Sequence, residues 1–146
     1  MKNTHFHVDT VAYYLIHLKP DISPIKLHKS LYFLFAYYGA TYNKLLFDTK
    51  FQAWKFGPVA YEVYSKYSDY SYSELKKIEK ATQLINSKPE IADFIHDLFN
   101  QIDTFSDFTL VERSHQDEAW KRAYRIAQAT EINNDFLIDE YKTRYM

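Results

Sequence analysis

A run of eight apolar residues, 31–38, constrains the fold of this chain more than any other segment. Such a run is too short to span a membrane, which takes about 20 apolar residues, so it indicates a buried helix. Ser23 and Pro24 just before it are typical of a helix N-cap and first helical position. Aromatic or aliphatic residues occupy every face of the segment, so we expect a central helix over about residues 24–38, surrounded on most sides.

Length and cysteine content limit the classes of protein that this chain can belong to. The 146 residues predict one domain over residues 1–146, with a core large enough to need no metal or disulfide. Cysteine is absent, which excludes thiol catalysis and iron–sulfur clusters and suits a reducing cytoplasm. The first ten residues have no apolar segment of a signal peptide. We therefore expect a cytoplasmic protein that does not associate with membranes.

Helical periodicity dominates the remaining sequence, apart from one short segment after the central helix. Asp9 is a candidate N-cap for a first helix, and Gly39 is expected to end the central one. Apolar and polar residues then alternate over residues 51–56, which favours a small β-hairpin over about residues 46–56. Gly57 and Pro58 are expected to open a further helix.

Four more helix starts complete the predicted fold. The pairs Ser71–Glu74 and Ser87–Glu90 have the spacing of a capping box. Ser106 and Asn133 precede further apolar periodicity. The sequence therefore predicts a mainly α fold, a compact multi-helix domain with one small hairpin.

Two groups of residues could support chemistry, and neither pattern is decisive. His5 and His7 could ligate a metal, but two histidines need further ligands, so a disordered terminus is the favoured interpretation and no metal site or cofactor is predicted. In residues 112–118, His115 lies among acidic, basic and hydroxyl side chains. A general acid–base role would need a second group within about 3 Å, so we favour a structural role for His115 over a catalytic one.

The charge distribution gives little support for nucleic-acid binding. Residues 1–66 carry a net charge of +4 and residues 67–146 carry −5, without a concentrated basic stripe. Lys26 and Lys29 lie three residues apart and could contact phosphates, but such pairs are commonly solvated lysines on a buried helix. Trp54 and Trp120 are expected to lie in the core or to anchor an interface.

Three motifs stand out along this chain. In the order of the chain, the motif residues are Lys26, Leu27, Lys29, Leu31 and Tyr32; then Leu46, Phe47, Ala53, Trp54, Gly57, Pro58, Val59, Val63 and Tyr64; and finally His115 and Trp120. These motifs resemble those of the Panacea antitoxin domain of SocA-like and phage-associated proteins. The similarity covers about residues 8–142, and its A-W-x-x-G-P-V segment is rather specific.

The chain departs from the family pattern at a few positions. His28 stands where glutamine is usual, Ser30 for leucine, Ser114 for threonine and Ala119 for proline, and Asn43 lies where a glycine is common. None of these changes removes a core or turn residue, so the expected fold is unchanged.

The resemblance implies a non-enzymatic, protein-binding domain that neutralises a cognate toxin by direct contact, with the toxin encoded by the adjacent gene. A proteolytic adaptor that delivers its target to an AAA+ protease, and a phage inhibitor of a host defence protein, are alternatives of the same physical kind. A DNA-binding regulator and a small hydrolase that uses His115 are alternatives of other kinds. The predicted partner-binding residues are Lys26, Lys29, Tyr32, Trp54, Tyr61 and Tyr64; structural roles are expected for Leu27, Leu31, Ala53, Gly57, Pro58, Val59, His115 and Trp120.

Overall fold

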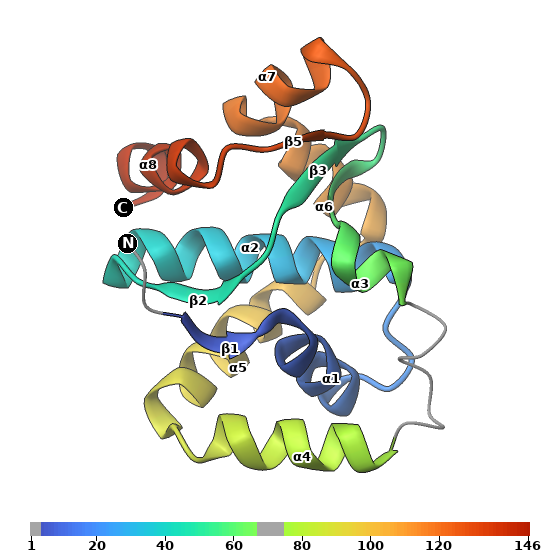
Figure 1. Cartoon of the computed structure of the whole chain (residues 1–146), viewed down its shortest axis with the longest axis vertical. Helices are drawn as coiled ribbons and strands as arrows, with labels where there is room; N and C mark the ends of the chain where they lie inside the picture. The colour runs from blue at the N-terminus through green and yellow to red at the C-terminus, as the bar shows by residue number, and fades with distance from the viewer. Residues whose placement is uncertain (1–3, 67–74) are drawn as a thin grey trace.

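The computed structural model describes residues 4–66 and 75–146, and the predicted mainly α fold is confirmed over them. Within these ranges the chain forms eight helices and five short strands (Figure 1). In chain order they are β1 (Thr4–His7), α1 (Val8–Leu18), α2 (Pro24–Tyr42), β2 (Leu45–Asp48), β3 (Phe51–Trp54), β4 (Gly57–Ala60), α3 (Tyr61–Ser65), α4 (Leu75–Asn86), α5 (Pro89–Asp103), α6 (Asp107–His115), α7 (Glu118–Ile126), β5 (Thr130–Glu131) and α8 (Asn134–Tyr145).

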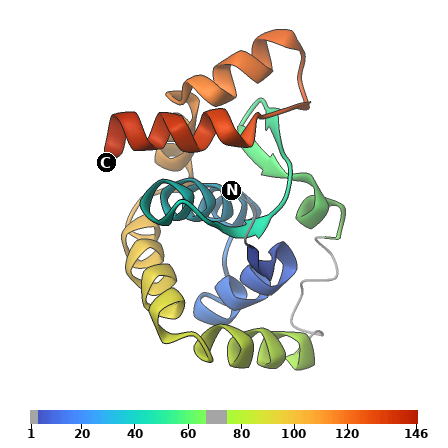
Figure 2. The ribbon, with the colours of Figure 1, turned by 60° about the vertical axis from the view of Figure 1, so that its left-hand side comes forward.

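The central position of α2 is also confirmed. This helix contacts α1, α5, α6, α8, β2 and β4. In both views, α1 and α4 lie on one side of α2, and α7 and α8 lie on the other (Figures 1 and 2). Ser23 is the N-cap, and its hydroxyl accepts the Lys26 N–H at 3.0 Å. The apolar residues on every face of α2 are therefore explained by neighbours on nearly every side.

Gly39 does not end the central helix, contrary to expectation. The helix continues to Tyr42, and Asn43 closes it in the left-handed conformation with φ 56°. A Cβ atom on Gly39 would lie 2.7 Å from Ile138 Cδ1. Gly39 therefore allows close packing of α2 against α8, and Asn43, which tolerates positive φ, provides the stop.

Residues Thr4–His7 have a regular structure, which corrects two expectations. Residues Thr4–His7 form β1, which pairs in parallel with β2, so His5 and His7 do not belong to a disordered terminus. Helices α1 and α2 supply the long crossover that a parallel pair requires. The N-cap of α1 is His7 rather than Asp9, because His7 Nδ1 accepts the Asp9 N–H at 3.1 Å.

The hairpin lies further along the chain than expected. Strand β2 pairs with β1, whereas β3 pairs with β4, so the hairpin spans residues 51–60 rather than 46–56. Gly57 and Pro58 consequently belong to β4, and the next helix, α3, begins at Tyr61. In this sheet the strand order is β4-β3-β5. Pro58 is tolerated there because β4 is an edge strand, where a missing N–H breaks no inner ladder.

The other helix starts follow the sequence to different degrees. Ser106 and Asn133 are N-caps as predicted: they accept the N–H groups of Thr109 and Phe136 at 3.1 and 2.9 Å. Helix α5 instead has Lys88 at its N-cap, without a side-chain hydrogen bond, so Ser87 is not its cap. The Ser71–Glu74 pair falls outside the described residues.

A buried carboxylate, Asp117, joins three helices. The hydroxyls of Tyr32 and Tyr141 each donate to Asp117 Oδ2 at 2.6 Å, and Arg113 Nη1 donates to Oδ1 at 3.1 Å. Burial raises the pKa of Asp117, while the hydrogen bonds from the two tyrosines oppose this rise. These contacts connect α2, α6 and α8 to the residue that precedes α7.

Glu140 on α8 replaces the capping group that Asp117 does not supply. Asp117 is the N-cap residue of α7, but its side chain makes no capping hydrogen bond. Glu140 accepts the N–H groups of Glu118 and Ala119 at 2.6 and 2.9 Å. The negative charge at this helix start is also favourable for the helix dipole.

In the described part of the chain, no helix is long and apolar enough to cross a membrane.

Replacing Asp117 by alanine should destabilise the domain strongly. Two buried tyrosine hydroxyls and the Arg113 guanidinium would lose their acceptor, which typically costs about 3–5 kcal/mol. Urea unfolding of Asp117→Ala measures this loss. Asp139→Ala, an exposed change on α8, is the control and should stay within about 0.5 kcal/mol of the wild type. A loss below about 1 kcal/mol for Asp117→Ala would contradict the central role of this carboxylate.

Candidate partner-binding surface

Gly57 closes the turn between β3 and β4 and has two requirements that only glycine meets. Its φ is 105°, a backbone conformation that residues with a side chain rarely adopt. A Cβ atom at this position would lie 2.5 Å from both Lys29 Cε and Ser114 Oγ. The hairpin can therefore pack onto α2 and α6 only with a glycine at this point.

Two consecutive side chains of α2 bind the backbone of β4. Lys29 Nζ donates to the Pro58 carbonyl at 3.1 Å, and His28 Nδ1 accepts the Ala60 N–H at 3.2 Å. Burial lowers the pKa of Lys29 to about 7. Burial, together with the charge of Lys29, lowers the pKa of His28 to about 3, so the imidazole stays neutral at physiological pH.

Two side chains of the third motif, near the other end of the chain, bind the same hairpin. His115 Nε2 lies 2.8 Å from the Lys55 carbonyl, and Trp120 Nε1 donates to the Trp54 carbonyl at 3.0 Å. The two rings stack on each other, with centroids 4.2 Å apart and planes inclined at 29°. The lysine of the first motif and the histidine and tryptophan of the third thus hold the turn formed by the second.

The fixed hairpin and α3 present a group of aromatic side chains to solvent. Tyr61 and Tyr64 are 48% and 49% exposed, and Trp54 is half-buried. The Trp54 and Tyr64 rings lie 4.8 Å apart, and those of Tyr61 and Tyr64 lie 6.3 Å apart. We call these three residues the aromatic surface. Phe56, in the adjoining turn, is 60% exposed. Aromatic side chains of this kind are frequent anchors of protein interfaces.

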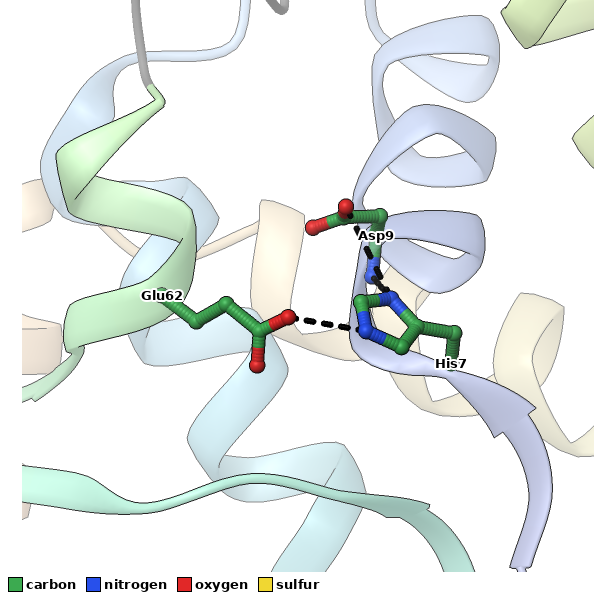
Figure 3. Close-up of side chains that lie close together, drawn as sticks. All are labelled: His7, Asp9 and Glu62. Carbon is green, nitrogen blue, oxygen red and sulfur yellow. Dashed lines mark hydrogen bonds and ion pairs between the residues drawn. The ribbon is translucent and has the colours of Figure 1, made fainter.

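A cluster of charged side chains joins α3 to the start of α1. His7 Nε2 lies 2.8 Å from Glu62 Oε2, and Asp9 lies on the other side of the imidazole (Figure 3). The ligand atoms of these three residues lie within 4.8 Å of one another, a spacing that could hold a metal ion. However, Lys66 Nζ is 3.1 Å from Asp9 and 3.8 Å from Glu62. A cation already neutralises both carboxylates, so the cluster is better described as an ion-pair network than as a metal centre.

Three of the predicted partner-binding residues lie inside the domain. Lys29 is 2% exposed, Tyr32 is fully buried, and Lys26 is buried with its ammonium 3.1 Å from Asp103. These residues hold helices and strands together and do not form an accessible surface. Trp54, Tyr61 and Tyr64 remain the predicted partner contacts.

Seven of the residues with a predicted structural role are buried: Leu27, Leu31, Ala53, Gly57, Pro58, Val59 and Trp120. His115 is partly buried against Trp120. The expected helix start at Gly57 gives no signal for an exposed Phe56. A turn at Gly57, which glycine equally favours, places Phe56 at an exposed hairpin tip.

The antitoxin SocA-like, Panacea domain model matches residues 27–121, which include nearly all of the motif residues described above. The chain belongs to this family. No curated protein and no solved structure matched it. The matched region of this Panacea domain begins in α2 and ends in α7, so it contains both sides of the contact with the β3–β4 hairpin.

The buried Lys29 should make the stability of the domain depend on pH. In the unfolded chain a lysine keeps its proton up to a pKa near 10.5, whereas in the folded protein Lys29 loses it above pH 7 or so. The unfolded state therefore binds more protons between these values, and the free energy of unfolding should rise with pH by up to about 1.4 kcal/mol per unit. Urea unfolding between pH 7.5 and 8.5, where tyrosines in the unfolded chain still keep their protons, measures the slope.

Lys29→Met should remove this rise, while Lys55→Met, at an exposed position in the hairpin turn, should keep it. An unchanged slope in Lys29→Met would mean that Lys29 does not lose its proton in the folded protein.

Gly57→Ala should destabilise the domain by about 2–5 kcal/mol, because it adds both backbone strain and overlap with Lys29 and Ser114. Ala129 also has a positive φ, 69°, but is exposed. Ala129→Gly should relieve strain and leave stability equal or up to about 1 kcal/mol higher. Thermal unfolding compares the two variants, and a Gly57→Ala protein as stable as the wild type would refute the packing argument.

Proposed function

We propose that this Panacea domain is a cytoplasmic antitoxin that neutralises the toxin encoded by an adjacent gene through direct binding. On this proposal residues 1–146 act as a single domain without a catalytic centre or cofactor. Family membership supports the antitoxin role in general. The observation that carries the binding role is the convergence of three motif segments on one hairpin, next to which Trp54, Tyr61 and Tyr64 are presented together.

The physical basis of binding would be a rigid, pre-formed aromatic surface. Hydrogen bonds from Lys29, His115 and Trp120 fix the hairpin backbone before any partner arrives. Little ordering entropy would then be lost on association, which favours affinity. The neighbouring charges of Glu62 and Lys66 would lie at the rim, where they set orientation and association rate more than affinity.

The contacts of His115 favour this binding role over hydrolysis. Its Nε2 atom is engaged by the Lys55 carbonyl, and its ring face is covered by Trp120. A backbone carbonyl can only accept, so Nε2 carries the proton and the ring holds the hairpin turn, a structural role that its packing against Trp120 supports. Delivery of a bound toxin to an AAA+ protease, and inhibition of a host defence protein by a phage-encoded copy, are finer versions of the same proposal.

Co-expression with the adjacent gene product tests the antitoxin role. The neighbour alone should arrest growth, and this chain should restore growth and co-purify with it. A harmless neighbour, or one that does not bind, would overturn the proposal.

Tyr61→Ala/Tyr64→Ala should keep the fold and weaken toxin binding by about 30-fold or more, as expected for two interface anchors. Phe108→Ala/Ile126→Ala is the matched control, since both side chains are exposed apolar residues on other helices. Isothermal titration with the purified toxin measures the affinities. Equal losses in both double variants, or no loss in either, would remove the aromatic surface from the proposed interface.

A further inference from the structure

A groove with a volume of about 720 Å³ lies between α2, α5 and α6, away from the aromatic surface. Its floor is apolar and consists of Phe33, Phe94, Leu98, Ile102 and Leu110. Tyr42 and Phe105, which also line it, are each half-exposed. Exposed aromatic residues beside an apolar floor are typical of a binding groove.

One wall of the groove is acidic. Glu90, Asp93 and Asp97 lie on α5 at positions i, i+3 and i+7, so they occupy one face of the helix over about 10 Å. All three are exposed, and no ion pair within residues 4–66 and 75–146 involves them. They therefore form a row of carboxylates without a partner cation among the described residues.

The single cationic side chain that lines the groove, as far as the structure describes it, is already engaged. Arg113 bonds to Asp117 at 3.1 Å, and its guanidinium lies over the Tyr145 ring, 4.3 Å from the centroid. It cannot neutralise the α5 carboxylates without leaving a buried charge unpaired. The acidic wall is thus available to a positively charged partner.

The apolar and acidic rows run along the same helix. Phe94, Leu98 and Ile102 follow one another at intervals of four residues, beside the row that begins at Glu90. A partner helix laid along α5 would place an apolar face on the first row and flanking basic residues on the second. A small polar ligand fits less well, because the carboxylates lie exposed on one wall instead of converging inside the groove.

We propose that this groove binds a basic amphipathic helix of the toxin, with apolar residues at i, i+3 or i+4 and i+7 flanked by lysine or arginine. This inference rests on the proposed function and adds to it a second contact and the chemistry of the segment bound. The carboxylates of α5 would steer the helix and fix its register, while the apolar floor would supply most of the affinity.

Charge reversal on the acidic wall tests the proposal, with the toxin that the wild type neutralises as the probe. Asp93→Lys/Asp97→Lys should lower toxin affinity at least about 30-fold with unchanged thermal stability, since like charges would then face each other. Glu79→Lys/Asp139→Lys makes the same change in net charge at exposed positions outside the groove and should stay within about threefold. Overlapping 20-residue peptides of the toxin identify the bound segment.

The expected peptide is basic and has an amphipathic helical pattern. Changing its lysines or arginines to glutamate should restore binding to Asp93→Lys/Asp97→Lys and abolish binding to the wild type. Full neutralisation by the groove variant would overturn the groove assignment and leave the antitoxin role standing. Binding of an acidic or non-helical peptide, or an altered oligomeric state of the free variant, would assign the groove to another occupant and overturn the proposal. A wild type that neutralises nothing would refute the antitoxin role itself, and the groove assignment with it.

Discussion

The carboxylate of Asp117 is the interaction on which the arrangement of this domain most depends. It lies in a site without solvent, where an unpaired charge would cost several kcal/mol, and it is compensated by two tyrosine hydroxyls and one guanidinium from three different helices. Because the two carboxylate oxygens of Asp117 are fixed in place, each helix that donates a hydrogen bond to them has one position at which all three bonds form. The carboxylate therefore sets the positions of α2, α6 and α8, while Glu140 completes the start of α7.

At the β3–β4 hairpin, polar side chains bind backbone groups instead of other side chains. A two-stranded hairpin alone is marginally stable, and here β5 adds only two residues to the sheet. Lys29, His28, His115 and Trp120 bind four backbone groups of the hairpin from two sides. The position of the turn is thus set by α2, α6 and α7.

Local sequence signals predict the helices and strands of this fold better than the tertiary contacts between them. The Ser23–Pro24 start and the apolar faces of residues 31–38 were sufficient to place the central helix. The expectations for Gly39 and Gly57 are wrong because a glycine can mark a helix stop, a close packing contact or a turn, and the local sequence does not distinguish these. The role of each glycine depends on distant neighbours: Ile138 for Gly39, and Lys29 and Ser114 for Gly57. Lys29 was expected at the surface because lysine is rarely buried. The acceptor of its hydrogen bond is a carbonyl 29 residues away, which the sequence around Lys29 cannot predict.

The residues that stabilise this domain differ from those proposed to bind its partner. Substitutions could therefore change the partner that is bound without changing the stability of the fold. Asp117, Lys29 and Trp120 are buried and bonded, so changes there would disturb the whole fold. Tyr61, Tyr64, Asp93 and Asp97 are exposed, and substitutions at such positions usually alter stability by less than about 0.5 kcal/mol. A change in the aromatic surface or in the acidic wall could therefore alter the partner without altering the core. Because the two surfaces lie on separate elements, their contributions to affinity should be close to additive.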